Sequence, residues 1–305
     1  MIDLSNRVAI VTGAGSGLGR SHAIALAARG AKVVVNDLGA AVSGSGSDRG
    51  PATTVADEIS AAGGIAVPEY SSVATPEGGE AIVRRALDAF GQVDILVNNA
   101  GNIELSSFAK LDVRAIHSIL DVHLGGAFYV TQPAYRAMLS RRRGSIIYTV
   151  SAVATFGNLG ASVYGAAKGG ILGLMSVLKL EAARHGIKVN AIAPMAQTRM
   201  AADVQLSQYT HVSERSVSPD LVAPAVVYFA SDECKLTGEV WSVGSGTVAR
   251  LFAGRSKGWF KHPDREGELT AEDIAENLDN VRDVASFTTP ESWTAEWELV
   301  LENFS

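Results

Sequence analysis

The sequence has a single cysteine, Cys234, in 305 residues. One thiol cannot form an intramolecular disulfide, so the composition favours a reducing compartment over a small disulfide-stabilised fold. Cys234 stands in the polar stretch 231–235, with no histidine beside it and no nucleophile motif around it. This stretch predicts a surface turn, in which the thiol is a bystander.

Positive charge and long apolar runs are also scarce. The formal net charge is −6 and the sequence shows no basic face, which argues against a nucleic-acid partner. No apolar run approaches the length that spans a bilayer, no signal region precedes the strand-like run Val8–Val11, and the last residues are not a peroxisomal address. We therefore expect a soluble, cytoplasmic protein with no membrane partner.

The chain is rich in short β-branched runs that alternate with longer helical stretches. The runs are apolar on both faces, as parallel strands covered by helices on each side require. The predicted strands are Val8–Val11, Lys32–Asn36, Ile65–Pro68, Val93–Val97, Ser145–Val150, Lys188–Ile192 and Val240–Val243. They predict a doubly wound α/β fold with one seven-stranded parallel sheet, which binds its ligand beyond the carboxyl ends of the strands.

No internal repeat and no linker divide the chain. We expect a single dinucleotide-binding catalytic domain, residues 1–250, followed by a helical extension, residues 251–305. In the extension Trp293, Trp297 and Leu301 recur along one side of a predicted helix. Short helices are marginal in water by themselves, so this stripe should pack on the core or on a partner subunit.

A glycine-rich turn follows the first predicted strand and precedes a helix. Glycines let the backbone turn sharply, and they let a pyrophosphate approach the helix N-terminus, where N–H groups and the helix dipole favour anions. The spacing is T-G-x-x-x-G-x-G, carried by Thr12, Gly13, Gly17 and Gly19. A tight strand-to-helix connection is the alternative, but an acid after the second strand supports a dinucleotide site.

That acid is Asp37. A carboxylate at this position accepts hydrogen bonds from the ribose hydroxyls of the adenosine and repels a 2′-phosphate. Residues 16 and 38 are Ser and Leu, so no cation is placed to bind such a phosphate. The sequence therefore favours NAD over NADP, with an ordinary strand-end cap as the alternative role for Asp37.

A Gly/Ser-rich insertion, residues 39–50, comes directly after Asp37. Its composition favours a flexible surface loop. The alternative is a flap near the adenosine of the cofactor.

Tyr164 and Lys168 are four residues apart and so share one face of a predicted helix. A free tyrosine has a pKa near 10, too high for a base at neutral pH. The Lys168 cation and the positive nicotinamide would both stabilise the phenolate and lower this pKa. Ser151 ends the preceding strand, and its hydroxyl can hydrogen-bond the substrate oxygen.

These motifs together, with Asn98–Gly101, resemble the signature set of the short-chain dehydrogenase/reductase family over residues 5–250. The resemblance implies a Rossmann-type sheet and hydride transfer between a nicotinamide and a carbonyl or secondary alcohol. It implies Tyr164 as general acid/base, Lys168 on the nicotinamide ribose and Ser151 on the substrate. The expected cofactor-binding residues are Gly13, Ser16, Gly17, Leu18, Gly19, Asp37, Ser72, Val73, Asn99, Ala100, Gly101, Tyr164, Lys168, Pro194 and Thr198. No metal site is expected.

The chain departs from the family pattern at several positions. His123 stands where most members have an asparagine that builds a proton relay to the lysine, so a relay role and a hydrogen-bonded core histidine are both open. Ser71–Val73 replaces the usual aspartate beside adenine, and Pro194-Met195 replaces the usual Pro-Gly.

A closer resemblance is to the dehydrogenase unit of peroxisomal multifunctional enzymes that oxidise (3R)-hydroxyacyl-CoA, also described as 17β-hydroxysteroid dehydrogenases. The similar stretches are Val11–Arg20, Val33–Gly39, Gly157–Lys168 and Ile192–Met200. This implies a CoA thioester or steroid-derived substrate and a homodimer or homotetramer. The alternatives are a dehydrogenase of a free alcohol, sugar or terpenoid, and a non-catalytic NAD-binding regulator. The run Arg141–Arg143 is typical of a solvated helix end, although it can attract CoA phosphates.

Overall fold

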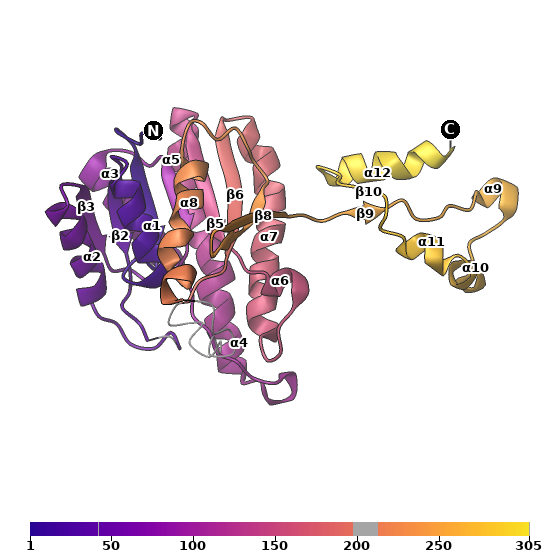
Figure 1. The fold of residues 1–305 in the computed structure, drawn as a ribbon, viewed down its shortest axis with the longest axis horizontal. Helices are drawn as coiled ribbons and strands as arrows, with labels where there is room; N and C mark the ends of the chain where they lie inside the picture. Colours follow the sequence, from indigo (N-terminus) through magenta and orange to yellow (C-terminus); the bar gives the residue numbers. More distant parts are fainter. Residues whose placement is uncertain (42, 198–212, 305) are drawn as a thin grey trace. The chain divides into compact units, whose positions relative to one another are not determined.

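The computed structural model describes residues 1–41, 43–197 and 213–304. The chain divides into two compact units, Met1–Arg250 and Leu251–Ser305. Figure 1 shows the elements of each unit.

The first unit is built on an eight-stranded sheet of order β3-β2-β1-β4-β5-β6-β7-β8. The strands are β1 Val8–Thr12, β2 Lys32–Asn36, β3 Ile65–Glu69, β4 Ile95–Asn98, β5 Gly144–Thr149, β6 Ile187–Pro194, β7 Val240–Gly244 and β8 Thr247–Leu251. Each pairing from β3 through to β7 is parallel. The predicted α/β sheet is confirmed.

The prediction of seven strands, all parallel, is wrong by one strand. Ser245 and Gly246 connect β7 to β8, and both have positive φ angles, 51° and 78°. A two-residue turn of this kind joins antiparallel strands. β8 was not predicted because four of its five residues are exposed, and it therefore lacks the apolar pattern that identifies the other strands.

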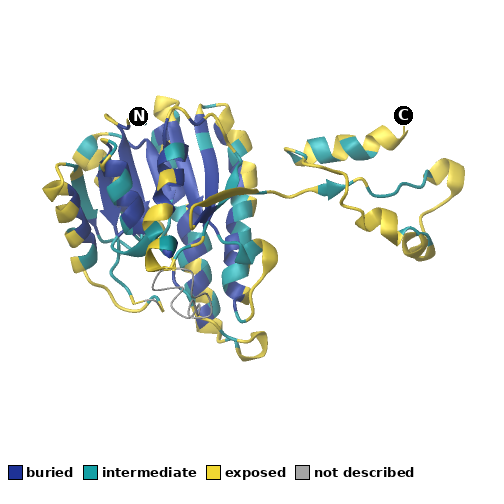
Figure 2. Ribbon diagram, in the orientation of Figure 1, coloured by how far each residue is buried: buried dark blue, intermediate teal, exposed yellow. Residues whose placement is uncertain are grey.

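Helices cover both faces of the sheet in this unit. They are α1 Gly17–Ala27, α2 Gly50–Ala61, α3 Pro76–Phe90, α4 Val113–Leu120, α5 Gly126–Arg141, α6 Val153–Phe156, α7 Ser162–Ala183 and α8 Ala223–Ala230. α1 contacts α2 and α8 on one face, while α3 packs on α5, and α7 packs on β6 and α4. The central strands β1, β2, β4, β5 and β6 are mostly buried between these layers (Figure 2).

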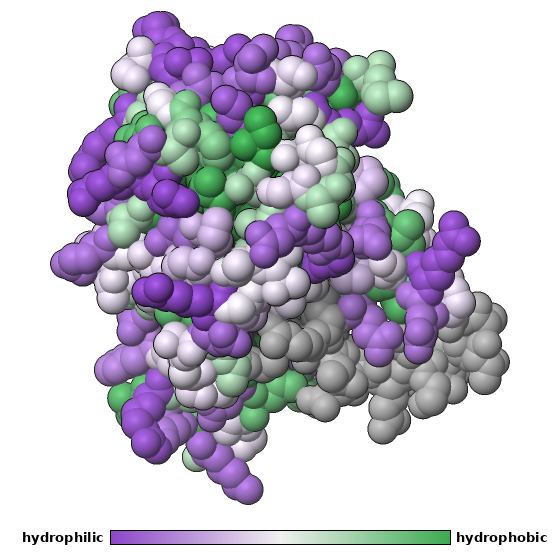
Figure 3. All heavy atoms as spheres, turned by 90° about the vertical axis from the view of Figure 1, so that its left-hand side faces the viewer, coloured by the Kyte–Doolittle hydropathy of each residue, from purple (hydrophilic) through white to green (hydrophobic). Residues whose placement is uncertain are grey.

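β3 is one of the two edge strands of the sheet, and its first residue, Ile65, is exposed. Polar and charged side chains predominate on the surface at this end of the molecule (Figure 3). In an open parallel α/β sheet of this kind, ligands bind beyond the carboxyl ends of the strands.

Cys234 is buried, with 1% of its surface exposed. The prediction that it lies in a surface turn is wrong for this side chain. Lys188, in β6, donates hydrogen bonds to the carbonyl oxygens of Ser231 and Cys234. These bonds hold the polar segment against the sheet, although its sequence is typical of a solvated turn.

α7 is long and apolar enough to cross a membrane by length and composition, and it is the one such helix in the described part of the chain. The expectation that no segment reaches this length is therefore wrong. Its buried residues include Ala167, Lys168, Ile171 and Met175. α7 packs on β6 and α4, and 33% of its apolar stretch is buried.

The second unit has short elements and no buried residue among those described. They are β9 Arg255–Ser256, α9 Pro263–Glu266, α10 Ala271–Glu276, α11 Leu278–Arg282, β10 Phe287–Thr288 and α12 Trp293–Leu301. The rings of Trp293 and Trp297 stack at 6.2 Å, yet both side chains remain exposed. That this stripe packs on the core or on a partner subunit stays a prediction.

Candidate active site and cofactor cavity

A cavity of about 330 Å³ lies at the carboxyl ends of β1, β2 and β4. Its volume is within the range of small-molecule sites. The predicted cofactor residues that line it are Gly13, Ser16, Gly17, Leu18, Gly19, Asp37, Ser72, Val73, Asn99, Ala100 and Gly101. Their roles toward a cofactor stay predictions, but the fold brings them to one place.

The glycine turn packs so closely against neighbouring backbone atoms that a residue with a Cβ atom would not fit at Gly13 or Gly19. Gly13 has a φ of +63°, and a Cβ atom there would lie 2.7 Å from the Cα of Ala100. A Cβ atom at Gly19 would overlap the carbonyl oxygen of Gly13. Gly17 and Gly19 of α1 therefore bring only backbone to the cavity wall, and a helix N-terminus of this kind suits a pyrophosphate.

The end of β4 supports this turn through hydrogen bonds. The Thr12 hydroxyl accepts from the backbone N–H groups of Asn99 and Ala100, each at 3.0 Å. The Asn99 amide donates to the carbonyl oxygens of Thr12 and Gly13 at 3.0 and 3.2 Å. The two motifs, far apart in sequence, form one rigid wall.

Asp37 is held in place by the backbone. Its two carboxylate oxygens accept from the N–H groups of Gly15 and Gly39, both at 2.7 Å. The described lining residues include two carboxylates, Asp37 and Asp121, and no lysine or arginine. A cavity with this charge fits ribose hydroxyls and disfavours an added phosphate.

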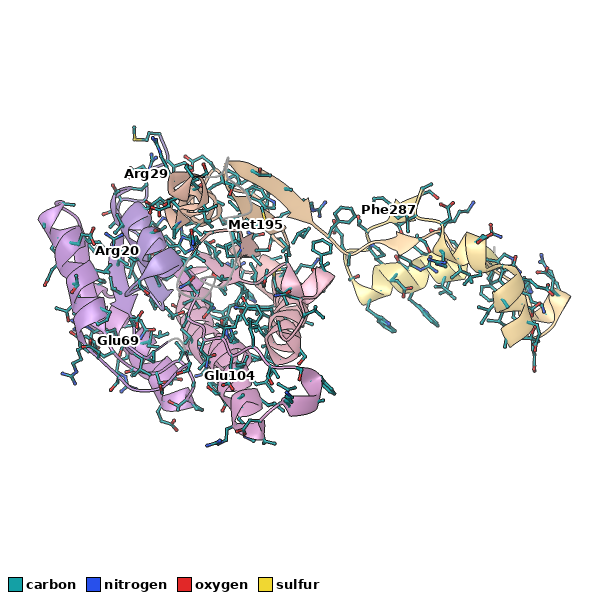
Figure 4. All side chains as sticks on the ribbon, turned by 60° about the horizontal axis from the view of Figure 1, so that its bottom comes forward. Arg20, Arg29, Glu69, Glu104, Met195 and Phe287 are labelled. Atoms are coloured by element: carbon teal, nitrogen blue, oxygen red, sulfur yellow. The ribbon has the colours of Figure 1, made fainter. Side chains whose placement is uncertain are left out.

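Arg20 is the cation that follows the glycine turn in sequence, but it does not line the cavity. Its guanidinium pairs with Glu58 of α2. Figure 4 shows Arg20 on α1 and Glu69 toward the edge of the sheet. Glu69 accepts a 2.6 Å hydrogen bond from the amide of Asn36, a cavity-lining residue that the sequence did not identify.

Tyr164 and Lys168 lie one turn apart on α7, with the Lys168 ammonium 5.7 Å from the phenol ring centroid. Lys168 is 3% exposed and donates a 2.6 Å hydrogen bond to the carbonyl oxygen of Thr149 in β5. Burial lowers the pKa of Lys168 to about 7. The end of β5 thus holds in place an amine whose protonation changes near neutral pH.

The pKa of Tyr164 is raised by burial, while a side-chain hydrogen bond with Ser151 acts in the opposite direction. The expected lowering of this pKa is therefore not seen in the protein by itself. Desolvation of the phenolate is the larger of these two effects. The catalytic roles of Ser151 and Tyr164 stay predictions.

The catalytic and cofactor residues are joined through a second, very small cavity. Lys168 and His123 line it, and it shares Val73, Ala100 and Val122 with the larger cavity. Pro194, at the end of β6, lines neither of these cavities. Thr198 lies outside the described residues.

His123 lies in a π-helical turn, Asp121–Gly125, between α4 and α5. Its Nε2 is 2.7 Å from the carbonyl oxygen of Asn102, and its ring stands edge-on to Tyr164 with centroids 5.3 Å apart. A Cβ atom at Gly101 would overlap the ring. His123 therefore holds the segment after β4 against the catalytic helix.

The protonation of His123 limits what it can do. Burial and the charge of Lys168 lower its pKa to about 3, so the ring is neutral at physiological pH. Nε2 either donates to the carbonyl oxygen of Asn102 or accepts from its backbone N–H at 3.2 Å, and in both tautomers Nδ1 is buried without a partner among the described residues. A half-satisfied ring beside the Lys168 cavity supports a relay role over a fully bonded core histidine, and that role stays a prediction.

We expect His123→Leu to lower kcat on the order of 10²-fold, whereas His123→Asn retains most activity, because only Asn keeps polar atoms beside Lys168. Steady-state kinetics across pH would measure this. The matched control is His22→Leu, because His22 is also buried, has its pKa lowered to about 3, and lines neither cavity. Unchanged kcat in folded His123→Leu would rule out a relay through this ring.

Comparison with known proteins agrees with this geometry. Residues 7–208 match the short chain dehydrogenase family. The chain is 42% identical over 263 residues to the peroxisomal hydratase-dehydrogenase-epimerase of Saccharomyces cerevisiae, covering 86% of this chain and 29% of that protein. It is 39% identical to a putative short-chain type dehydrogenase/reductase of Mycobacterium tuberculosis, covering 93% of this chain and 97% of that protein.

A solved structure shares the fold over nearly the whole chain. It is the full-length peroxisomal multifunctional enzyme type 2 from Drosophila melanogaster, with a TM-score of 0.81, 32% identity, and coverage of 99% of this chain and 50% of that one. The chain therefore spans half of the Drosophila protein and less than a third of the yeast protein. The chain belongs to the short-chain dehydrogenase/reductase family and is an oxidoreductase that acts on CH–OH groups.

Proposed function

We propose that this protein is an NAD-dependent dehydrogenase that oxidises the 3-hydroxyl of a (3R)-hydroxyacyl-CoA, or a secondary alcohol of a steroid-derived substrate. The observation that carries the proposal is that Tyr164 and Lys168 lie one turn apart on α7, with the Lys168 ammonium 5.7 Å from the phenol ring centroid and bonded to the Thr149 carbonyl oxygen at the end of β5. This set lies beside a cavity that fits a dinucleotide and lacks described cations. The yeast and Drosophila relatives, whose names include a hydratase-dehydrogenase and a peroxisomal multifunctional enzyme, support an acyl-CoA substrate.

The residues of the site have separate tasks in such an oxidation. Bound NAD would accept the hydride from the carbinol carbon. Tyr164 as phenolate takes the hydroxyl proton, and the Ser151 hydroxyl orients the same oxygen. Because burial raises the pKa of Tyr164, formation of the phenolate depends on nearby positive charge.

Lys168 supplies part of this charge. Its pKa of about 7 means that the amine is only partly protonated at neutral pH. A phenolate at Tyr164 would favour the ammonium, and the ammonium would favour the phenolate, so the two groups titrate as a pair. The hydrogen bond to Thr149 keeps the amine in position in both states.

An apolar hollow next to the catalytic loop supports an acyl substrate. Leu105 and Phe108 from the segment after β4 line it together with Leu159, which follows β5 and α6. A 2.9 Å hydrogen bond from the Ser106 N–H to the Gly160 carbonyl joins the two segments. Exposed apolar side chains gathered in this way mark a binding surface, and an acyl chain matches their chemistry.

The test is a comparison of kcat/KM among a (3R)-hydroxyacyl-CoA, its S isomer, and the same acyl group on a truncated thioester. We expect the intact R thioester to exceed the other two by at least about tenfold, because remote binding energy from the nucleotide handle contributes to the transition state. Equal values for all three would assign the protein to free alcohols. No turnover of any secondary alcohol, with NAD bound, would favour a non-catalytic regulator.

We also propose a cytoplasmic homodimer or homotetramer. The single cysteine supports the reducing location. Phe128 on α5 and Val177 and Leu180 on α7 are exposed apolar side chains that a subunit contact could cover. Enrichment in peroxisomes on cell fractionation, or a monomer in analytical ultracentrifugation, would contradict the respective part of this proposal.

A further inference from the structure

The Gly/Ser-rich insertion after β2 leaves the sheet and returns close to its starting point. The Asp48 N–H donates to the carbonyl oxygen of Leu38 at 2.9 Å, and the Gly39 N–H donates to the Asp37 carboxylate at 2.7 Å. The base of the insertion is thus fixed to the same carboxylate that we assign to the adenosine ribose. Whatever the insertion covers lies next to that ribose.

Backbone hydrogen bonds join Ala41 to Gly44 and Ser45 within the insertion. The Ala41 N–H donates to the Ser45 carbonyl, and the Gly44 N–H donates to the Ala41 carbonyl, both at 2.8 Å. We call residues 38–41 and 43–45 the strap. Leu38, Ala40, Ala41 and Gly44 line the cofactor cavity, so the strap forms one of its walls.

The tip of the strap meets the opposite wall of the cavity at Gly44. A Cβ atom on Gly44 would lie 2.7 Å from the amide nitrogen of Asn102 and 3.3 Å from the hydroxyl of Ser118. These two side chains are joined by a 2.9 Å hydrogen bond and also line the cavity. The strap therefore reaches from the end of β2 across to α4.

Only close contact holds the tip there. Among the described residues, no hydrogen bond or ion pair joins the strap to Asn102 or Ser118. A contact of van der Waals type over a single glycine is individually weak. Such a contact can open without breaking any polar interaction, which is what a reversible closure needs.

We propose that the strap encloses the adenosine end of a bound nicotinamide dinucleotide, and that opening of the contact between Gly44 and the Asn102–Ser118 pair sets the rate of cofactor release. The inference rests on the proposed NAD function. It deepens that function, because it assigns the insertion a role in retaining the cofactor rather than in chemistry. Release of a product past such a closure commonly limits turnover in enzymes.

The experiment measures NADH release from the full chain by stopped-flow fluorescence and NADH affinity by calorimetry, in Gly44→Val. We expect release to become about tenfold faster and affinity to fall by a similar factor, because overpacking at so close a contact pushes the tip off α4. Gly46→Val is the matched control. Gly46 also has a positive φ, +79°, but no atom lies within 4 Å of its added Cβ, so the backbone strain is similar and the clash is absent.

A second variant, Ser118→Leu, places a larger side chain on α4 opposite Gly44 and leaves the sequence of the strap unchanged. It should also speed release, with thermal melting used to show that the variant is folded. Equal release rates in Gly44→Val, Gly46→Val and wild type would overturn the proposed role of the strap, as would an unchanged rate in folded Ser118→Leu. Neither result would count against NAD binding. Failure of the wild type to bind NADH at all would overturn the proposed function, and the strap with it.

Discussion

Tyr164→Phe is expected to reduce turnover on the order of 10³-fold while leaving NAD affinity nearly unchanged. The substitution removes only the phenol oxygen, which contacts Ser151 and which we assign to proton transfer. A phenylalanine ring keeps the volume and the edge-on contact with His123, so the packing of α7 on the π-helical turn is retained. The measurements are kcat with a secondary alcohol substrate and NADH affinity by fluorescence titration.

Tyr135→Phe provides the control for this experiment. Tyr135 is a partly exposed tyrosine on α5 that lines none of the cavities described above, so its loss of a hydroxyl should not change kcat. If Tyr164→Phe turned over substrate at the wild-type rate, proton transfer by this residue would be refuted. A fall in NAD affinity equal to the fall in kcat would instead assign Tyr164 to cofactor binding.

Asp37→Ala should weaken NAD binding on the order of 10²-fold and narrow the preference for NAD over NADP. Hydrogen bonds to a charged group contribute about 1.5–3 kcal/mol, which corresponds to this range. Two effects add here, because alanine also removes the acceptor for the backbone N–H groups of Gly15 and Gly39. KM values for both cofactors, measured at one salt concentration, would show the change.

Asp37→Asn separates those two effects. It keeps the size of the side chain and an oxygen acceptor but removes the charge. The KM for NADP should therefore fall by a larger factor than the KM for NAD rises. Asp57→Asn on α2 is the control, because that carboxylate is exposed and does not line the cavity. A wild-type protein that uses NADP better than NAD would show that Asp37 does not face the ribose.

Local sequence was sufficient for the features that depend on a single segment. The seven parallel strands could be predicted from their apolar runs, because burial on both faces of a sheet disfavours polar residues. The turn at Gly13–Gly19 is specified by backbone conformation and by lack of space, which only glycine satisfies. The positions of Tyr164 and Lys168 on one face follow from helical periodicity.

Other features arise where distant segments meet, and these had no local signal. Asn36, Asn102, Ser118 and Asp121 line the cofactor cavity, yet each is an ordinary polar residue in its own segment. The strand β8 was missed because its exposed residues lack a pattern. Both kinds of omission have the same origin, since cavity walls and edge strands are defined by neighbours in space.

The sequence by itself therefore determined the α/β sheet, the glycine turn and the paired Tyr164 and Lys168, because periodicity and backbone conformation are local properties. Only the tertiary structure decided the burial of Cys234, the partner of His123 and the course of the 39–50 insertion. It also decided the burial of Tyr164, which raises the pKa of the phenol in the protein by itself. These depend on which surfaces come together and on how much water they exclude, and neither quantity is encoded in the order of residues within one segment.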